Sequence, residues 1–104
     1  TFCRIRVDVP YFKRVLDNLF ANVRKYADPS QPVSIAALPE ERTFHICICN
    51  VVRTDPGQVE SNKIGLRTAE KIVTQMGGRF LRHEADGKFT AEVVLPVAPE
   101  ETQP

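Results

Sequence analysis

The feature that most constrains the fold is a segment, residues 11–27, in which apolar side chains recur every three or four positions. They are Phe12, Val15, Leu16, Leu19, Phe20 and Val23. This spacing predicts an α-helix with one apolar stripe, which is buried against another element. Pro10 occupies a favourable first helical position, and the two prolines within residues 28–32 end the pattern.

Five further segments are predicted to be β-strands, because apolar and polar residues alternate along them or because turn signals bound them. They comprise residues 2–8, 33–38, 43–52, 79–84 and 88–95. Both faces of the segment 43–52 are fairly apolar, which indicates a central position in the sheet. Asp86 and Gly87 form the turn signal of a hairpin between the last two strands.

A second helix is predicted for residues 65–76, and the glycine pair 77–78 ends it. The resulting order of elements predicts an α+β fold. It is a two-layer sandwich, with a mixed, mostly antiparallel sheet of about five strands and helices on one face. We expect one domain over residues 1–97 and a disordered tail over residues 98–104. The polar loop 53–63 is the longest internal loop, and loops of that size are often functional.

Composition excludes several classes of protein. The chain has 104 residues, of which 42% are hydrophobic and 26% charged, as in an ordinary globular domain. Its net charge of +1 argues against a nucleic-acid partner. No apolar run reaches the roughly 18 residues of a membrane span, so we expect no direct membrane contact. The first residues carry neither an initiator Met nor a signal-peptide pattern, which predicts a piece of a longer protein.

The three cysteines, Cys3, Cys47 and Cys49, are an odd and sparse set. Such a set is a poor disulfide framework and indicates a reducing compartment. A metal site that also includes His45 is conceivable, but the chain lacks paired Cys-x-x-Cys knuckles. Two cysteines in an alternating strand are more often packed thiols, and this is the prediction we make.

Two polar features are candidates for chemistry. On the first helix, Asn18, Asn22 and Lys25 lie in one row at i, i+4 and i+7, with Tyr26 beside them. Asn is a mediocre helix former, so the row needs either a solvent or a ligand explanation, and a solvated face is the commoner one.

The second candidate is the start of the second helix, where Lys63 and Gly65 precede the apolar stripe. Free backbone N–H groups and the positive end of the helix suit a phosphate there. The alternative is an ordinary helix start that is capped by Ser61 or Asn62.

Taken in this order, the two features resemble the catalytic domain of sensor histidine kinases. Residues 14–27 are similar to the N-box of that family, a helix that carries Asn-Leu-x-x-Asn-Ala-x-Lys-Tyr. The segment 64–66, the helix after it and the glycine pair 77–78 are similar to the second glycine box and its helix. Residues 89–96 resemble the closing strand, which usually ends in Leu-Pro. The resemblance covers residues 2–96 and implies the Bergerat ATP-binding sandwich of the GHKL superfamily, shared with gyrase-type and chaperone-type ATPases.

The resemblance implies a role for each residue that matches. Asn22 matches the Asn that ligates the Mg²⁺ bridging the ATP phosphates, and an amide oxygen is a suitable hard ligand. The other implied roles are Asn18 near the phosphates, Lys25 as a point charge toward phosphate, Tyr26 against the base or ribose, and Gly65 and Leu66 as backbone donors to the phosphates.

The sequence also departs from the family pattern. The first glycine box, Asp-x-Gly-x-Gly, is missing, and strand alternation makes Asn50 the equivalent of its Asp. An Asn carbonyl can still accept the hydrogen bond from the adenine amino group, without charge assistance. Asp55 with Gly57 is a second candidate for that box. Lys63 stands where another glycine is common, and only residues 51–63 remain for the ATP lid.

A further departure is Arg14, at a position where the N-box often carries Glu or Gln. Together, the short lid and the altered boxes leave a degenerate, non-catalytic interaction module of the same fold as one alternative. A serine kinase of the anti-sigma type, which shares the fold, is another.

The function implied by the resemblance is the ATP-binding part of a two-component sensor histidine kinase. Such a domain binds ATP and Mg²⁺ and donates the γ-phosphate to a His on a separate dimerisation domain, and a response regulator then receives the phosphate. We expect the fragment to be monomeric and inactive by itself. Its parent is expected to be a homodimer in the bacterial cell membrane, with this domain in the cytoplasm.

Overall fold

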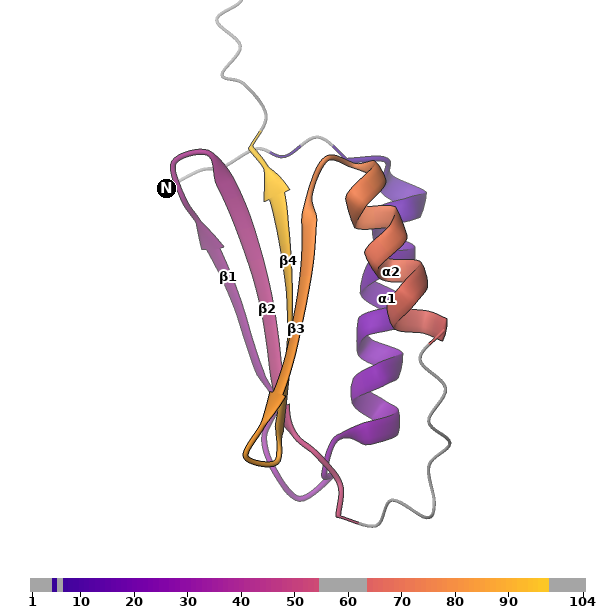
Figure 1. The fold of residues 1–104 in the computed structure, drawn as a ribbon, viewed down its shortest axis with the longest axis vertical. Helices are drawn as coiled ribbons and strands as arrows, with labels where there is room; N and C mark the ends of the chain where they lie inside the picture. Colours follow the sequence, from indigo (N-terminus) through magenta and orange to yellow (C-terminus); the bar gives the residue numbers. More distant parts are fainter. Residues whose placement is uncertain (1–4, 6, 55–63, 98–104) are drawn as a thin grey trace, which may run out of the picture.

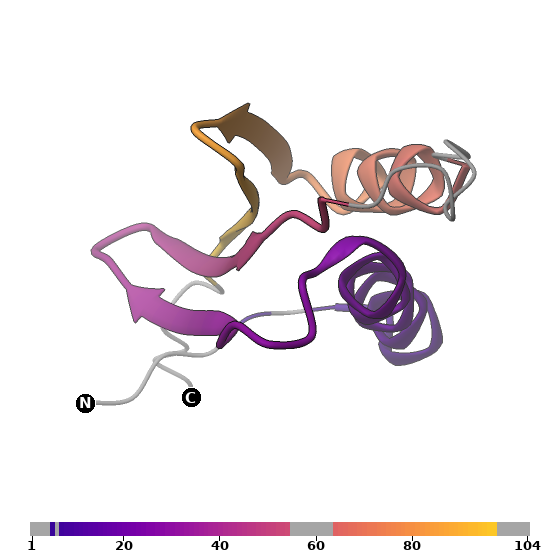
Figure 2. The same cartoon turned by 90° about the horizontal axis from the view of Figure 1, so that it is seen from below.

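The computed structural model describes residues 5, 7–54 and 64–97 of the chain (Figure 1). Its elements are α1 (Val9–Tyr26), β1 (Ser34–Pro39), β2 (Thr43–Val51), α2 (Ile64–Gln75), β3 (Arg79–Ala85) and β4 (Lys88–Pro96). The two helices lie side by side and form one layer, and the sheet forms the other, as the end-on view in Figure 2 shows. The predicted two-layer α+β sandwich is therefore confirmed.

The strand order in the sheet is β1-β2-β4-β3, and all three neighbouring pairs are antiparallel. The predicted central position of β2 is confirmed, because it pairs with β1 on one side and β4 on the other. The described residues form four strands instead of about five, and no parallel pair occurs among them. Of the predicted strand 2–8, the structure describes residues 5, 7 and 8, and among these Ile5 forms a single bridge to Val97. Alternation of apolar and polar residues predicts a segment with two different faces, but it does not predict which strand the segment pairs with. Helix α1 begins directly after this segment, at Val9.

The ends of helix α1 agree with the predicted range, residues 11–27, within two residues. Pro10 lies in its first turn, and the apolar stripe buries Val15 and Leu19, which are 0% and 2% exposed. Arg24 and Lys25 lie in the last turn, where positive side chains complement the helix dipole. The helix ends at Tyr26, and the N–H of the extended residue Ala27 still donates to the carbonyl of Val23.

The core lies between the helix layer and one face of the sheet. Its buried members are Val15, Leu19, Ile48, Leu66, Ala69, Ile72, Val73, Phe80, Ala91, Val93 and Leu95. Because side chains alternate along a strand, the opposite face of β2 carries His45, Cys47 and Cys49. We call this second surface, which faces away from the helices, the outer face.

The glycine pair ends α2 as predicted, but the two glycines are needed for different reasons. Gly77 has a φ of 82°, the left-handed conformation that closes many helices. Gly78 donates its N–H to the carbonyl of Val73 at 2.9 Å and lies directly against β4. A Cβ added at Gly78 would be 2.3 Å from the carbonyl oxygen of Val94. Close packing, not conformation, therefore demands the second glycine.

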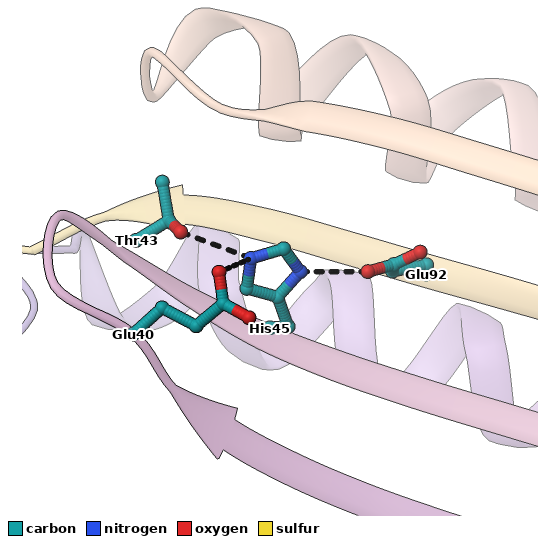
Figure 3. Close-up of polar contacts among 4 residues, drawn as sticks. All are labelled: Glu40, Thr43, His45 and Glu92. Carbon is teal, nitrogen blue, oxygen red and sulfur yellow. Dashed lines mark hydrogen bonds and ion pairs between the residues drawn. The ribbon is translucent and has the colours of Figure 1, made fainter.

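On the outer face, His45 connects the turn before β2 to strand β4 (Figure 3). Its Nδ1 lies 2.6 Å from Oε2 of Glu92, and its Nε2 lies 2.9 Å from the hydroxyl oxygen of Thr43. A carboxylate only accepts, so Nδ1–H donates to Glu92. Glu40 stands 3.4 Å from Nε2. Both ring nitrogens of His45 are thus engaged within the domain.

The neighbouring thiol of Cys47 has a raised pKa. Burial is the largest cause, followed by the electrostatic effects of Glu92 and then of Cys49. The thiolate is the nucleophilic form, so Cys47 stays protonated and unreactive at neutral pH. Both Cys47 and Cys49 are free thiols, and both are half-buried. Within the described residues, no three His, Cys, Asp or Glu side chains are arranged to hold a metal ion.

We expect the pH at which Cys47 alkylation reaches half its maximal rate to lie above that of a free thiol. Glu92→Gln should lower this pH, because it removes one negative neighbour, but not fully, because burial remains. Residue-resolved mass spectrometry with iodoacetamide measures the profile. Glu84→Gln, on β3 beside Phe89, serves as control. An unchanged profile in Glu92→Gln would show that this carboxylate does not act on the thiol.

No helix among the described residues is both long and apolar enough to cross a membrane.

Candidate functional site

The two polar features that the sequence singled out meet in space. Asn18, on α1, donates from its Nδ2 to the carbonyl oxygen of Gly65 at 3.1 Å, across 47 positions of sequence. A Cβ added at Gly65 would lie 3.9 Å from both Cβ and Cγ of Asn18. The beginning of α2 therefore rests on the polar row of α1, and the side chain of Asn18 is half-buried between them.

The rest of the row continues along the same helix face. Asn22 lies one turn beyond Asn18 and is half-buried. Lys25 is exposed, and its ammonium group stands 5.9 Å from the centroid of the Tyr26 ring, within the range of a cation–π contact. The row thus offers two amide side chains and one ammonium group on a single surface.

Backbone hydrogen bonds attach the end of α1 to the end of β2. The N–H of Arg53 donates to the carbonyl of Tyr26, and the N–H of Asp28 donates to the carbonyl of Val51, both at 2.8 Å. Ala27 and Val52 form an antiparallel bridge between these two bonds. The polar row on α1 is therefore held beside the last residues of β2, where Asn50 lies.

Asn50 is the buried polar residue of this site, with 3% of its surface exposed. Its Nδ2 donates to the carbonyl of Val51 at 3.1 Å. Its Oδ1 is buried and accepts no hydrogen bond from any residue that the structure describes. Since a backbone carbonyl can only accept, this bond fixes the amide with its nitrogen toward Val51 and leaves its oxygen open.

An unsatisfied buried carbonyl costs about 1–3 kcal/mol, so it is unusual in a native core and needs an explanation. The alternation of β2 located Asn50 in the sequence. Nothing in the sequence indicated that its oxygen would lack a partner among the described residues, because that depends on which groups β4 and α1 bring near it. For the same reason, the sequence did not indicate that the carbonyl of Val51 accepts two hydrogen bonds, one from the N–H of Asp28 and one from Nδ2 of Asn50.

The beginning of α2 offers backbone donors. The first N–H groups of a helix have no intrahelical partner, and no acidic side chain lies in the first turn of α2 to neutralise its positive end. Gly65 is half-buried, whereas Leu66 is 2% exposed and its side chain belongs to the core. Leu66 can therefore contribute only backbone atoms. The other predicted residues, Asp55, Gly57 and Lys63, lie outside the described residues.

Sequence comparison finds a relative among bacterial signalling proteins. The chain is 31% identical over 85 residues to the sensor histidine kinase YrkQ of Bacillus subtilis (strain 168). The match covers 82% of this chain and 20% of that protein, so the chain spans about a fifth of the relative's length. No protein-family model matches the chain.

Structural comparison points to the same class. The histidine kinase AdeS of Acinetobacter baumannii matches with a TM-score of 0.70 at 14% identity, over 86% of this chain and 47% of that one. The catalytic domain of the histidine kinase ThkA, in a nucleotide-free form, matches with a TM-score of 0.74 at 19% identity. That match covers 92% of this chain and 73% of ThkA's.

The fold is therefore that of a histidine kinase catalytic domain. Together with the sequence match, it identifies the chain as a divergent relative of the sensor histidine kinases.

Proposed function

We propose that this chain is the ATP-binding catalytic domain of a two-component sensor histidine kinase. The open Oδ1 of Asn50, buried at the end of β2, is the observation that carries the proposal. The exocyclic amino group of adenine is a donor of the kind this oxygen lacks. Guanine presents a carbonyl at the same ring position, which the fixed orientation of the Asn50 amide would repel.

The same surface suits the phosphates and a magnesium ion. The amide oxygen of Asn22 is a hard ligand, and Mg²⁺ completes its shell with water and phosphate oxygens. Lys25 supplies positive charge, and the first turn of α2, which holds no acidic side chain, supplies backbone donors near Gly65. When bound, Mg²⁺ would neutralise part of the phosphate charge. The residues that the chain provides therefore fit ATP with Mg²⁺.

The reaction we propose is transfer of the γ-phosphate to a His on a separate dimerisation domain, and from there to a response regulator. The role of this domain would be to bind and orient ATP, because phosphoryl transfer depends mainly on positioning and electrostatic stabilisation. His45 is engaged by Glu92 and Thr43, and His83 lies within β3. Neither suits an acceptor. A membrane-bound homodimeric parent, with this domain on the cytoplasmic side, belongs to the same proposal.

The test is a heteronuclear NMR titration of the chain with a hydrolysis-resistant ATP analogue and Mg²⁺. We expect shifts of the Asn50 side-chain amide, of the Gly65 amide and of Asn22, and weaker shifts with the corresponding GTP analogue. Omission of Mg²⁺ should weaken the effect at Asn22 most. If the analogue moves none of these signals at millimolar concentration, the domain is not an ATP-binding module, and the non-catalytic alternative is favoured.

Gly65→Ala separates binding from folding. The added methyl group would meet Asn18 only at an ordinary contact distance of 3.9 Å, so the fold should tolerate it. Alanine is favoured over glycine within a helix by roughly 0.5–1 kcal/mol, so the melting temperature should hold or rise. The methyl group would narrow the space between α2 and the α1 row, and we expect about a tenfold loss of ATP affinity, worth about 1.4 kcal/mol.

The control for this variant is Lys71→Ala, on the exposed side of α2. It should change neither the melting temperature nor the affinity appreciably. If Gly65→Ala binds ATP as tightly as the unchanged chain does, the phosphates do not bind at the start of α2.

A further inference from the structure

A polar contact joins the two helices of this domain. Helices α1 and α2 lie side by side (Figure 2), and Nδ2 of Asn18 donates to the carbonyl oxygen of Gly65 at 3.1 Å between them. A carbonyl inside an α-helix accepts one N–H from four residues ahead and keeps a second lone pair. At Gly65 the amide of Asn18 occupies that second position. The bond therefore adds to the hydrogen bonds of α2 and replaces none of them.

Asn18 suits this contact in its length and in its chemistry. Its Cβ and Cγ lie close to the backbone of Gly65, since a Cβ added there would be 3.9 Å from both atoms. A backbone carbonyl only accepts, so the nitrogen of the amide faces Gly65. Aspartate at this position would set a second acceptor against the carbonyl. Leucine has nearly the same size as asparagine but offers the carbonyl no donor.

Two contacts of different kinds hold the first turn of α2. The side chain of Leu66 is 2% exposed and belongs to the core, which sets how close the turn stands to the rest of the domain. Apolar packing is non-directional, whereas a hydrogen bond weakens steeply when its angle is distorted. The bond from Asn18 to Gly65 therefore adds what Leu66 does not supply, namely the rotation of the turn and its position along α1.

The position of this turn matters for the proposed nucleotide site. That site takes phosphate donors from the backbone of α2 near Gly65, and it takes a metal ligand from Asn22 on α1, one helical turn beyond Asn18. Groups on two separate elements bind one ligand well when their relative placement is fixed beforehand. Asn18 belongs to one of these elements and is hydrogen-bonded to the other.

We propose that Asn18 is a positioning residue, which holds the first turn of α2 at the distance from Asn22 that the phosphates of ATP require. This role rests on the proposed function. The sequence pattern placed Asn18 near the phosphates, whereas the observed bond assigns its amide to the backbone of α2. Loss of the bond should weaken ATP binding through the backbone donors of α2, and it should leave recognition of adenine by Asn50 intact.

The first measurement is amide hydrogen exchange, followed by NMR, in the full 104-residue chain without nucleotide. The variants are Asn18→Leu and Asn18→Ala. The amides of residues 68–70 donate to carbonyls in the first turn of α2, and we expect them to exchange faster in both variants. The increase should be about threefold to tenfold, the range for the loss of one hydrogen bond. Residues 73–75, at the other end of α2, should exchange as before, which shows that global stability is kept.

The second measurement is the affinity of the same variants for an ATP analogue with Mg²⁺ and for adenosine, which has no phosphates. We expect the affinity for the ATP analogue to fall about threefold to tenfold. The affinity for adenosine, followed through the side-chain amide of Asn50, should hold. The matched control is Asp17→Asn, which changes the neighbouring exposed residue of α1 and removes its ion pair with Lys13. It should alter neither exchange nor affinity.

Several results would overturn this role of Asn18. Weaker ATP binding with unchanged exchange would mean that Asn18 contacts the phosphates directly. Faster exchange with unchanged ATP affinity would mean that the bond serves the fold alone. Equal weakening of ATP and adenosine would indicate a general loosening of the domain. If the unchanged chain binds ATP and both variants match it, only the role of Asn18 is refuted. If the unchanged chain binds no ATP, the proposed function is refuted, and the role of Asn18 with it.

Discussion

Replacing Gly78 with alanine is expected to lower the free energy of unfolding by about 2–4 kcal/mol. The new Cβ would stand 2.3 Å from the carbonyl oxygen of Val94, 3.0 Å from Cδ2 of Leu95 and 3.1 Å from Cγ1 of Val73. A side chain could rotate away, but the Val94 carbonyl belongs to β4, which is paired on both sides. Relief of the clash must therefore separate α2 from the sheet, and small domains have only about 5–15 kcal/mol in total.

Urea unfolding followed by circular dichroism measures the loss, and Gly87→Ala is the matched control. Gly87 has a φ of 75°, but a Cβ there would meet nothing within 4 Å. Alanine at position 87 should lower the free energy of unfolding by only about 1–2 kcal/mol, which is the cost of the left-handed backbone conformation for a residue with a Cβ. If the two alanine variants lose the same stability, the close approach of Gly78 to β4 is not what makes that glycine necessary.

Asn50→Leu is expected to weaken binding of the ATP analogue by about tenfold to a hundredfold, with little change in stability. Leucine has nearly the same size and lacks the acceptor that we assign to the adenine amino group. The folded chain loses the bond from Nδ2 to Val51, but that carbonyl keeps its bond from the N–H of Asp28. It also loses an unsatisfied buried oxygen, which offsets part of the cost.

Calorimetric titration with ATP and GTP analogues, with Mg²⁺ present, measures the effect, and urea unfolding reports the stability of the same sample. Preference for adenine over guanine should disappear in Asn50→Leu. Gly65→Ala is the comparison, since it should weaken both nucleotides equally by acting at the phosphates. If Asn50→Leu still prefers the ATP analogue over the GTP analogue, a different residue recognises adenine and the role proposed for Asn50 is wrong.

The sequence predicted the helices and most strands well, because their signals are local. The apolar stripe around Val15 and Leu19 and the proline and glycine stops defined both helices within two residues. Asp86 and Gly87 predicted the β3–β4 hairpin correctly. Most of the strand predicted for residues 2–8 lies outside the described residues, and Ile5, which is described, forms a bridge to Val97.

The site could be predicted only in part. Helical spacing aligned Asn18 with Asn22, and strand alternation singled out Asn50. Neither could show that Asn18 reaches Gly65, since the two lie 47 positions apart and their contact depends on how α1 packs against α2.

The sequence by itself determined the elements of this protein and their order, because periodicity, prolines and glycines act over a few neighbouring residues. The tertiary structure alone decided three further properties. The carbonyl oxygen of Asn50 is buried without a donor among the described residues, Gly78 has no room for a methyl group, and β1 lies beyond the cover of the helices. Each depends on distances between segments that are remote in the chain, and only the packed sheet and helices set those distances.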